Sequence, residues 1–369
     1  MSDKNLIADI EKAIAKIDNK DFNVYFVVFD SKGVPSASLE YIYKTGLCLK
    51  NKGYNVSFLH AESEFVGVES WLGAEYAELP HYSIAEGSKD AVSISPSDFL
   101  FIPEVYQSIL AKTKSFPCKR IVIVQNYKYL TDSMPAGVSF NDLRINECVT
   151  TSENLRKKLL KAFPYMKTNV VRPSISESLF NESEADSKKL IINVVINDTV
   201  DANEIIKPFY WKYPIYSWVP LRPLQNLPKD EFAKALRESF ATIWCDPKTD
   251  FGYSAIEAMK CGNLVIGRVP ENDVDWLYEE DGAIKENGLW FFKTDDAQDG
   301  IAAAIQTFLT NSIPSGVFEK MKKTVEPYTE ENQSKDIETV YVKGIFEERK
   351  SEFKKHIQNL EKNNEEETK

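Results

Sequence analysis

The stretch W-C-D-P-K-T-D-F-G-Y-S-A-I-E-A-M-K-C-G-N-L-V-I-G, residues 244–267, sets out a strand, a loop, a helix and a second strand. The apolar residues 241–245 predict the end of a buried strand, residues 246–250 are rich in turn formers, and residues 254–260 have helical spacing. Gly262 stands where a helix C-cap glycine belongs, and the apolar residues 264–266 begin the next strand. This order is typical of an α/β domain.

The loop of this stretch ends where the helix begins, at Phe251, Gly252, Tyr253 and Ser254. The first backbone N–H groups of a helix have no partner within it and lie at the positive end of its dipole, so they suit a diphosphate. Gly252 lets the backbone approach a ligand closely. Glu257 lies one turn inside the helix, where its carboxylate could accept hydrogen bonds from a ribose diol. We therefore predict an anion site at this turn.

These residues resemble the donor-site signature of retaining GT-B glycosyltransferases, which reads E-x-F-G-x-x-x-x-E-A-M-A-x-G before an apolar strand. Six residues match it position for position: Phe251, Gly252, Glu257, Ala258, Met259 and Gly262. Thr249 stands in place of the first glutamate, and Asp250 follows it. In that family this glutamate contacts the transferred sugar, so the resemblance implies that Thr249 and Asp250 face the sugar.

The chain has 369 residues, a formal net charge of −11 and a hydrophobic share of 43%. This length suffices for two domains, each with its own core. The negative charge argues against sequence-independent binding of nucleic acid, but it leaves a local basic groove open. No apolar run approaches the ~20 residues of a membrane-spanning helix, and the N-terminus lacks a signal-peptide core. The five cysteines form no C-x-x-C pair, so we expect reduced thiols and a cytoplasmic location, in the host cytoplasm if the protein is phage-encoded.

The first half of the chain has a βαβ rhythm. The apolar residues 22–29 predict a buried strand, and the loop 30–38, a helix over 39–50 and a strand over 54–59 follow. This order is similar to the start of GT-B enzymes, where the first loop faces the cleft. Strands are also expected over 98–102, 120–124 and 147–151. We place the acceptor side at the first loop and at the end of the strand 120–124, with Ser31, Lys32, Gly33, Gln125, Asn126 and Tyr127.

The second half begins after a polar, acidic linker at residues 174–188, and residues 189–196 predict the first strand of a second domain. In active relatives the next loop often carries the Arg and Lys that neutralise the donor diphosphate, but residues 197–201 have no positive charge. Arg222, expected in a loop, is the nearest substitute. We do not expect Asp273 and Asp275 to bind a metal, because they follow a strand in the wrong half of the chain for a D-x-D motif.

The expected fold is α/β, with two Rossmann-like domains that face each other across a cleft, as in the GT-B class. The predicted parts are an acceptor-side domain at 1–173, the linker, a donor domain at 189–328, a helix at 329–360 that packs back on the first domain, and a tail at 361–369. The resemblance implies a retaining, metal-independent hexosyltransferase that needs no cofactor and uses a nucleotide-diphosphate sugar, with a UDP-sugar expected. It assigns catalysis to Asp250 and Thr249, and donor binding to Phe251, Gly252, Tyr253, Ser254, Glu257 and Arg222.

Two alternatives remain open for the function. Residues 101–106, 118–125 and 269–272 resemble glycosyltransferase-like proteins of bacteriophages, which favours transfer to hydroxymethylated bases in DNA. That alternative draws on a basic set, although we prefer to interpret the set as ordinary solvated helix faces: Lys112, Lys114, Lys119, Arg120, Arg156, Lys157, Lys158 and Lys161. The other alternative is a catalytically inactive binding or regulatory protein, favoured by Thr249 and by the loop 197–201. The acceptor, whether glycan, lipid, small molecule or DNA, is not named by the sequence.

Overall fold

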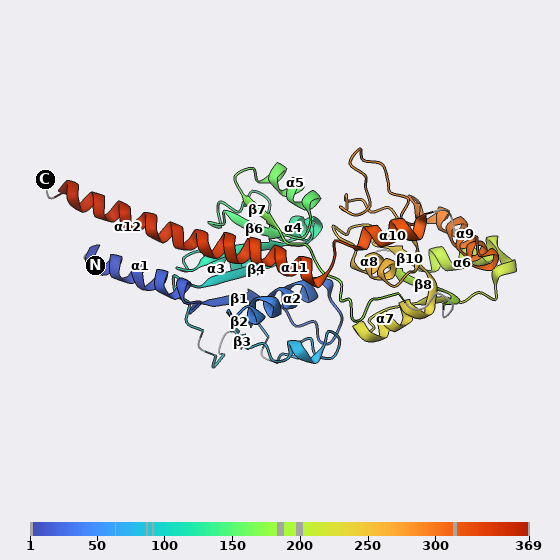
Figure 1. The fold of residues 1–369 in the computed structure, drawn as a ribbon, viewed down its shortest axis with the longest axis horizontal. Helices are drawn as coiled ribbons and strands as arrows, with labels where there is room; N and C mark the ends of the chain where they lie inside the picture. The colour runs from blue at the N-terminus through green and yellow to red at the C-terminus, as the bar shows by residue number, and fades with distance from the viewer. Residues whose placement is uncertain are drawn as a thin grey trace.

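The protein is described by a computed structural model, which covers residues 3–62, 64–85, 88–90, 92–182, 188–196, 202–312 and 316–367. The molecule is elongated, with one domain in the middle and a second domain at one end (Figure 1). The helices α1 Asp3–Asp18 and α12 Glu347–Glu367 extend from the other end. Both chain termini therefore lie at the end far from the second domain.

The N-terminal domain is built on a parallel sheet of strand order β3-β2-β1-β4-β5-β6-β7. Its strands are β1 Asn23–Val27, β2 Asn55–His60, β3 His81–Ser83, β4 Phe99–Pro103, β5 Lys119–Val124, β6 Glu147–Thr150 and β7 Lys167–Val170. Every residue of β4 is buried, because apolar side chains on both faces are covered by helices. These helices are α2 Ala37–Asn51, α3 Gln107–Lys112, α4 Tyr127–Ser133 and α5 Glu153–Ala162.

The C-terminal domain is built on a second parallel sheet, of order β12-β11-β10-β8-β9. Its strands are β8 Lys189–Ile196, β9 Leu221–Pro223, β10 Ser239–Cys245, β11 Leu264–Arg268 and β12 Leu289–Phe291. Its helices are α6 Asn203–Lys212, α7 Lys229–Glu238, α8 Tyr253–Lys260, α9 Ala297–Thr310 and α10 Val317–Val325. The two parallel sheets with helical crossovers confirm the predicted α/β class.

Each sheet has one point at which the strand order reverses, between β1 and β4 in the N-terminal domain and between β8 and β10 in the C-terminal domain. At such a point the loops after two neighbouring strands run in opposite directions and leave a crevice at the carboxyl ends of the strands. The fold therefore marks two places for ligands, one in each domain.

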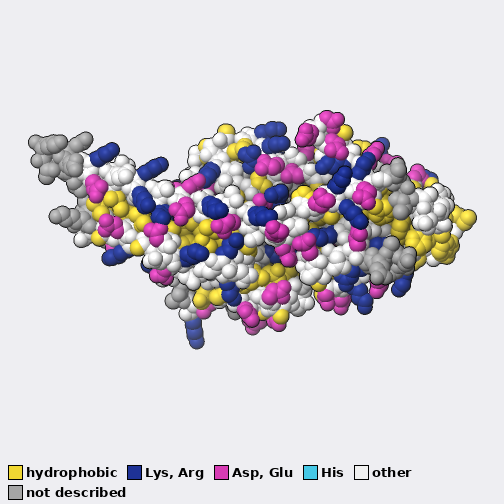
Figure 2. Space-filling model, viewed as in Figure 1, with side chains coloured by type: hydrophobic (Ala, Val, Ile, Leu, Met, Phe, Trp, Pro, Cys, Tyr) yellow, Lys and Arg dark blue, Asp and Glu magenta, His cyan; other side chains and the backbone are white. Residues whose placement is uncertain are grey.

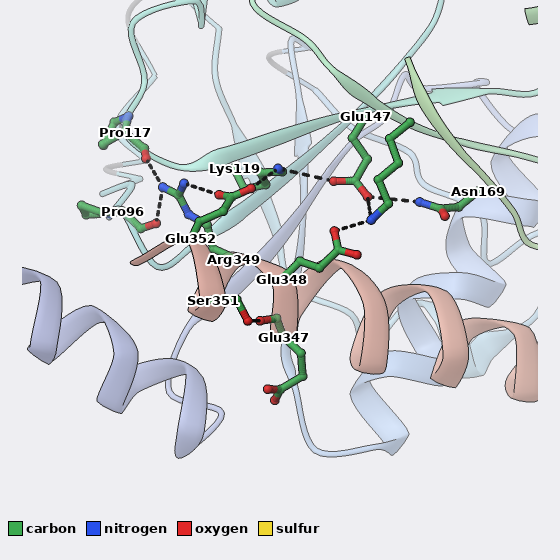
Figure 3. Close-up of polar contacts among 11 residues, drawn as sticks. Pro96, Pro117, Lys119, Glu147, Asn169, Glu347, Glu348, Arg349, Ser351 and Glu352 are labelled. Carbon is green, nitrogen blue, oxygen red and sulfur yellow. Dashed lines mark hydrogen bonds and ion pairs between the residues drawn. The ribbon is translucent and has the colours of Figure 1, made fainter. Parts of the chain in front are cut away.

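The C-terminal segment returns to the N-terminal domain through α11 Glu330–Ile337, a π-helical segment Glu338–Phe346 and α12 Glu347–Glu367. The ring of Phe346 lies 4.5 Å from that of Phe99 and 5.1 Å from that of Phe22. Lys119 pairs with Glu147 at 3.4 Å and with Glu352 of α12 at 2.9 Å (Figure 3). The segment is thus part of the N-terminal core, and α12 continues to Glu367, through the stretch that we expected to be a tail.

Three short elements differ from the sequence-based expectation. A further strand, β3, lies between the strands that we expected over 54–59 and 98–102. Helix α4 begins directly at Tyr127, because the Asn126 side chain accepts hydrogen bonds from the amides of Lys128 and Tyr129 and caps the helix. Arg222 lies in the edge strand β9, not in a loop, since Leu221, Arg222 and Pro223 pair with β8.

Candidate donor site

A cavity of about 290 Å³ lies at the strand reversal of the C-terminal sheet. Val195 comes from β8 and Asp246 follows β10, so the cavity lies at the carboxyl ends of the two strands where the order reverses. The side facing the N-terminal domain includes Pro35 and Ala37. Its other lining residues are Leu224, Gln225, Asn226, Leu227, Lys229, Phe232, Thr249, Tyr253, Ser254 and Glu257.

Thr249 and Gly252 shape the turn at the mouth of α8. The Thr249 hydroxyl accepts hydrogen bonds from the backbone N–H groups of Gly252 at 2.8 Å and Phe251 at 3.2 Å. Gly252 has a φ of +80° and precedes the first helical residue. The amides of Tyr253 and Ser254 begin the helix, so no carbonyl within it can accept from them. These two residues line the cavity, and the turn therefore presents free N–H donors where we predicted an anion site.

Glu257 is buried in the wall of this cavity and pairs with a cation. Its side chain is 2% exposed, and its Oε1 lies 2.5 Å from the Nζ of Lys229. Burial raises the pKa of Glu257, and the Lys229 ammonium opposes that shift. Among the described lining residues Lys229 is the one cation. Lys229 thus provides the positive charge for this cavity that the sequence did not place.

Asp250 lies at the boundary between the two domains. Its Oδ2 accepts a hydrogen bond of 2.7 Å from the backbone N–H of Tyr127, and its Oδ1 is 3.7 Å from the Nζ of Lys158. Burial raises the pKa of Asp250 and raises that of the neighbouring Asp246 to about 6. Asp250 and Thr249, the two predicted catalytic residues, both line a smaller cavity of about 100 Å³, which also contains Gln125 and Asn126.

A third cavity, of about 270 Å³, lies at the strand reversal of the N-terminal sheet, between the ends of β1 and β4. Gln125 and Ser38 line both this cavity and the smaller one, and the Gln125 amide donates to the Ser38 carbonyl at 3.1 Å. Glu104, at the end of β4, accepts from the backbone N–H groups of Gln125 and Asn126 at 3.0 and 2.9 Å. Burial raises the pKa of Glu104 to about 7, although these hydrogen bonds oppose the shift.

The predicted donor residues meet in one place, with one exception. Phe251, Gly252, Tyr253, Ser254 and Glu257 lie together on the turn and on α8. Arg222 does not line the cavity. Its guanidinium donates to Asn193 at 3.0 Å and to the Ala235 carbonyl at 2.7 Å. β9 holds Arg222 against α7, away from this cavity, so the assignment of Arg222 to the diphosphate stays a prediction without a supporting contact.

The predicted acceptor residues are divided between two places. Gln125, Asn126 and Tyr127 lie at the cleft, as described above. Ser31, Lys32 and Gly33 line none of the three cavities. The later part of the same loop does so instead, through residues 35–38. Lys32 and Gly33 have φ values of +51° and +81° and form a turn before the chain reaches the cleft, so an acceptor role for the first half of the loop stays a prediction.

Several residues at the cleft were not singled out from the sequence. Glu104 directly follows a buried strand, and a carboxylate at that position is a signal that could have been used. Lys229 begins α7, and no signal in the sequence indicates that its side chain reaches Glu257. The residues 197–201 and part of the expected linker, residues 183–187, lie outside the described part of the chain.

Asp275 has a structural role across the domain boundary. Its carboxylate accepts from the backbone N–H groups of Glu153 at 2.7 Å and Asn154 at 2.9 Å, so a residue of one domain caps helix α5 of the other. Within the residues that the structure describes, no group of three or more His, Cys, Asp or Glu side chains is placed to hold a metal ion. Among the described helices, none has the length and apolar character to cross a bilayer.

Comparison with known proteins points to one class of enzyme. No protein-family model matches the chain. The α-1,6-glucosyltransferase of Actinobacillus pleuropneumoniae serotype 7 (strain AP76) is 24% identical over 259 residues, which are 68% of this chain and 73% of that protein. The pneumococcal O-GlcNAc transferase GtfA, solved with UDP and GlcNAc, superposes with a TM-score of 0.60 at 8% identity, over 92% of this chain and 99% of that one.

A further solved structure with the same architecture is an α-glucosyltransferase in complex with UDP and a 13-mer DNA containing an HMU base. It superposes with a TM-score of 0.56 at 11% identity, over 85% of this chain and 99% of that one. The chain has the GT-B fold, and the resemblance to glycosyltransferases that residues 244–267 indicated is confirmed. Its relatives in sequence and in fold are glycosyltransferases.

Proposed function

We propose that the protein is a retaining glycosyltransferase that transfers a sugar from a nucleotide-diphosphate sugar, with a UDP-sugar as the expected donor. The observation that carries this proposal is the 290 Å³ cavity at the strand reversal of the C-terminal sheet, which combines free amides at the start of α8 with the buried carboxylate of Glu257. The relatives that are solved with UDP have the same fold.

In the proposed complex each part of the donor meets a chemically matched group. The amides of Tyr253 and Ser254 bind the diphosphate, and Glu257 accepts hydrogen bonds from the ribose hydroxyls. The sugar then extends toward Thr249, which lines both the donor cavity and the small cavity between the domains, and toward Asp250, which lines the small cavity. The helix dipole and these amides stabilise the leaving diphosphate, so we propose transfer without a metal.

The acceptor enters from the N-terminal domain, through the 270 Å³ cavity at the end of β1 and β4. Gln125 connects this cavity with the small one that contains Asp250. Glu104 lies at the same junction, and its raised pKa suits a carboxylate that receives a proton from a hydroxyl group near neutral pH. The sugar and the acceptor would therefore meet between Asp250 and Gln125.

A thermal-shift screen tests the proposal with the wild-type protein and UDP, GDP, ADP and their common sugar derivatives, with and without magnesium. A ligand that binds the native state raises the melting temperature by mass action. We expect UDP and a UDP-sugar to stabilise the protein without magnesium, and Glu257→Ala to weaken binding by about 1–3 kcal/mol. If the wild type responds to none of these nucleotides, the non-catalytic alternative replaces this proposal.

The alternative of transfer to DNA bases draws support from the fold neighbour solved with DNA, but not from the basic set. Lys119 and Arg120 are the first residues of β5, at the opposite end of this strand from Gln125. The Arg120 guanidinium is buried and donates to the carbonyls of Leu110 and Leu143. Lys158 is the member that reaches Asp250. On the face in Figure 2, Lys and Arg side chains alternate with Asp and Glu, without one continuous basic area. We therefore prefer an acceptor other than DNA.

A further inference from the structure

Four buried charged side chains join the two domains beside the donor cavity, and we call them the buried charge cluster: Lys44, Glu40, Lys229 and Glu257. Lys44 and Glu40 lie on α2 of the N-terminal domain, 2.8 Å apart between Nζ and Oε1. Lys229 bridges the domains, with its Nζ 2.7 Å from Glu40 Oε2 and 2.5 Å from Glu257 Oε1. The cluster thus alternates in sign and crosses from one domain to the other.

Burial makes this arrangement costly to disturb. The side chains of Glu40 and Glu257 are each 2% exposed, that of Lys44 is 9% exposed and that of Lys229 is 12% exposed. Two carboxylates face two ammonium groups, so the cluster is neutral as a whole. Removing one member leaves a buried charge without a partner, whereas removing a matched pair does not.

The two carboxylates are not equivalent. Burial raises the pKa of both, but Glu40 has two ammonium neighbours, Lys229 and Lys44, which lower the pKa of Glu40 to about 2. Glu257 has Lys229 as its ion-pair partner, and its pKa stays raised. The pKa of Lys229 is raised, because the two carboxylates outweigh its burial. The charge of Glu257 therefore depends on Lys229 more than the charge of Glu40 does.

Lys229 uses one oxygen of Glu257, Oε1, while the residue itself lines the donor cavity. The carboxylate is thus fixed at one oxygen and leaves the other for a ligand. The backbone of Lys229 is also tied to the N-terminal domain, since its N–H donates to the Trp71 carbonyl at 3.0 Å. Both ends of the residue therefore depend on the arrangement of the two domains.

We propose that Lys229 is a positioning residue that keeps Glu257 charged and oriented for the ribose, and that its bond to Glu40 makes donor affinity depend on the contact between the domains. This inference rests on the proposed function, in which Glu257 binds the nucleotide. Lys229 itself lines the donor cavity, but in this proposal its ammonium, held between Glu40 and Glu257, acts through Glu257 and not through a contact of its own with the nucleotide. It follows that the effects of changing Lys229 and Glu257 should not add.

The experiment is a double-mutant cycle on UDP affinity, measured by isothermal titration calorimetry on the full chain. The variants are Lys229→Met, Glu257→Gln and the double variant. The double variant removes a matched pair of charges and leaves the cluster neutral, so it can be measured even where Lys229→Met alone is too unstable to study. Lys229→Arg tests rescue by charge, and Lys234→Met, on the exposed face of the same helix, is the matched control. Glu40→Gln tests the connection between the domains.

We expect Lys229→Met and Glu257→Gln each to weaken UDP binding by about tenfold to a hundredfold, the scale of a charge-assisted hydrogen bond. The double variant should bind UDP with the affinity of Glu257→Gln alone. Lys229→Arg and Lys234→Met should bind UDP with the affinity of the wild type. Glu40→Gln should weaken binding by less than Lys229→Met. The inference is overturned if the two effects on UDP affinity add, so that the double variant binds UDP more weakly than Glu257→Gln by the full effect of Lys229→Met. An unchanged UDP affinity of Lys229→Met also overturns it. Wild-type affinity in Glu40→Gln refutes the connection between domains. Failure of the wild type to bind UDP contradicts the proposed function instead.

Discussion

Substitution of Gly252 by alanine tests whether the turn at the donor site has room for any side chain. Gly252 has a φ of +80°, and a Cβ at this position would lie 2.7 Å from the Cζ2 of Trp244 and 3.3 Å from that of Trp276. The left-handed conformation costs an alanine about 1–2 kcal/mol. The overlap adds about 1–3 kcal/mol, because the buried Trp244 ring cannot move without disturbing the core. We therefore expect Gly252→Ala to lower the free energy of unfolding by about 2–5 kcal/mol.

Gly282→Ala is the matched control, since Gly282 has a φ of +87° and no atom within 4 Å of its added Cβ. It should show the backbone strain of about 1–2 kcal/mol alone. Urea unfolding followed by tryptophan fluorescence suits both variants, because Trp244, Trp276 and Trp290 pack on one another beside Gly252. Equal losses in the two variants would refute the reasoning, as they would show that the contact with Trp244 has no cost.

Three further predictions concern single side chains of the cleft. Thr249→Val removes the acceptor for two backbone N–H groups of the turn and should destabilise the protein by about 1 kcal/mol in urea unfolding. Thr249→Ser keeps the hydroxyl and should retain most of that stability, and equal stability of the two variants would contradict the role of this hydroxyl in the turn. Burial raises the pKa of Glu104 to about 7, so ionisation of this carboxyl group should lower the stability of the folded protein as the pH rises from 4.5 through 7. Glu104→Gln removes this titration, so its free energy of unfolding relative to that of the wild type should increase by about 3 kcal/mol between pH 4.5 and pH 8. Stability curves of the two proteins that run parallel over this range would contradict the prediction. Asp275→Ala removes the acceptor for two backbone N–H groups at the start of α5 from across the domain boundary and should cost about 1 kcal/mol. The same change at the exposed Asp281, whose carboxylate accepts one hydrogen bond within its own turn, from the Ala283 N–H at 3.0 Å, should cost less in the same assay.

The part of the site that could be predicted from the sequence is the part that local structure determines. Gly252, Ser254 and Glu257 lie on one loop and one helix, so their spacing along the chain already determines their spacing in space. The match with the donor signature therefore located the turn, the free amides and the buried carboxylate. The βαβ rhythm likewise predicted the two sheets, because buried parallel strands are long apolar runs whose period is easy to recognise.

The part that could not be predicted depends on contacts between distant segments. Arg222 belongs to an edge strand of three residues, which is too short to give a period, and only its pairing with β8 turns the guanidinium toward α7. Lys229 is one of many lysines at a helix start, and its role follows from the approach of α2 and α8 from different domains. Glu104 became a candidate once the end of β4 was seen to meet the end of β5 at the cleft.

Residues of the proposed donor and acceptor sides also form the contacts between the two domains. The Asn126 side chain donates to the Lys248 carbonyl at 3.0 Å, and the Tyr127 amide donates to Asp250 at 2.7 Å. Asp250, expected to face the sugar, is thus held by the acceptor-side domain. If the domains separate, Asp250 loses this hydrogen bond and Glu257 loses the link to Glu40 at the same time. In the proposed mechanism the geometry for transfer therefore requires this contact between the domains, so an acceptor that stabilises the contact would also strengthen donor binding.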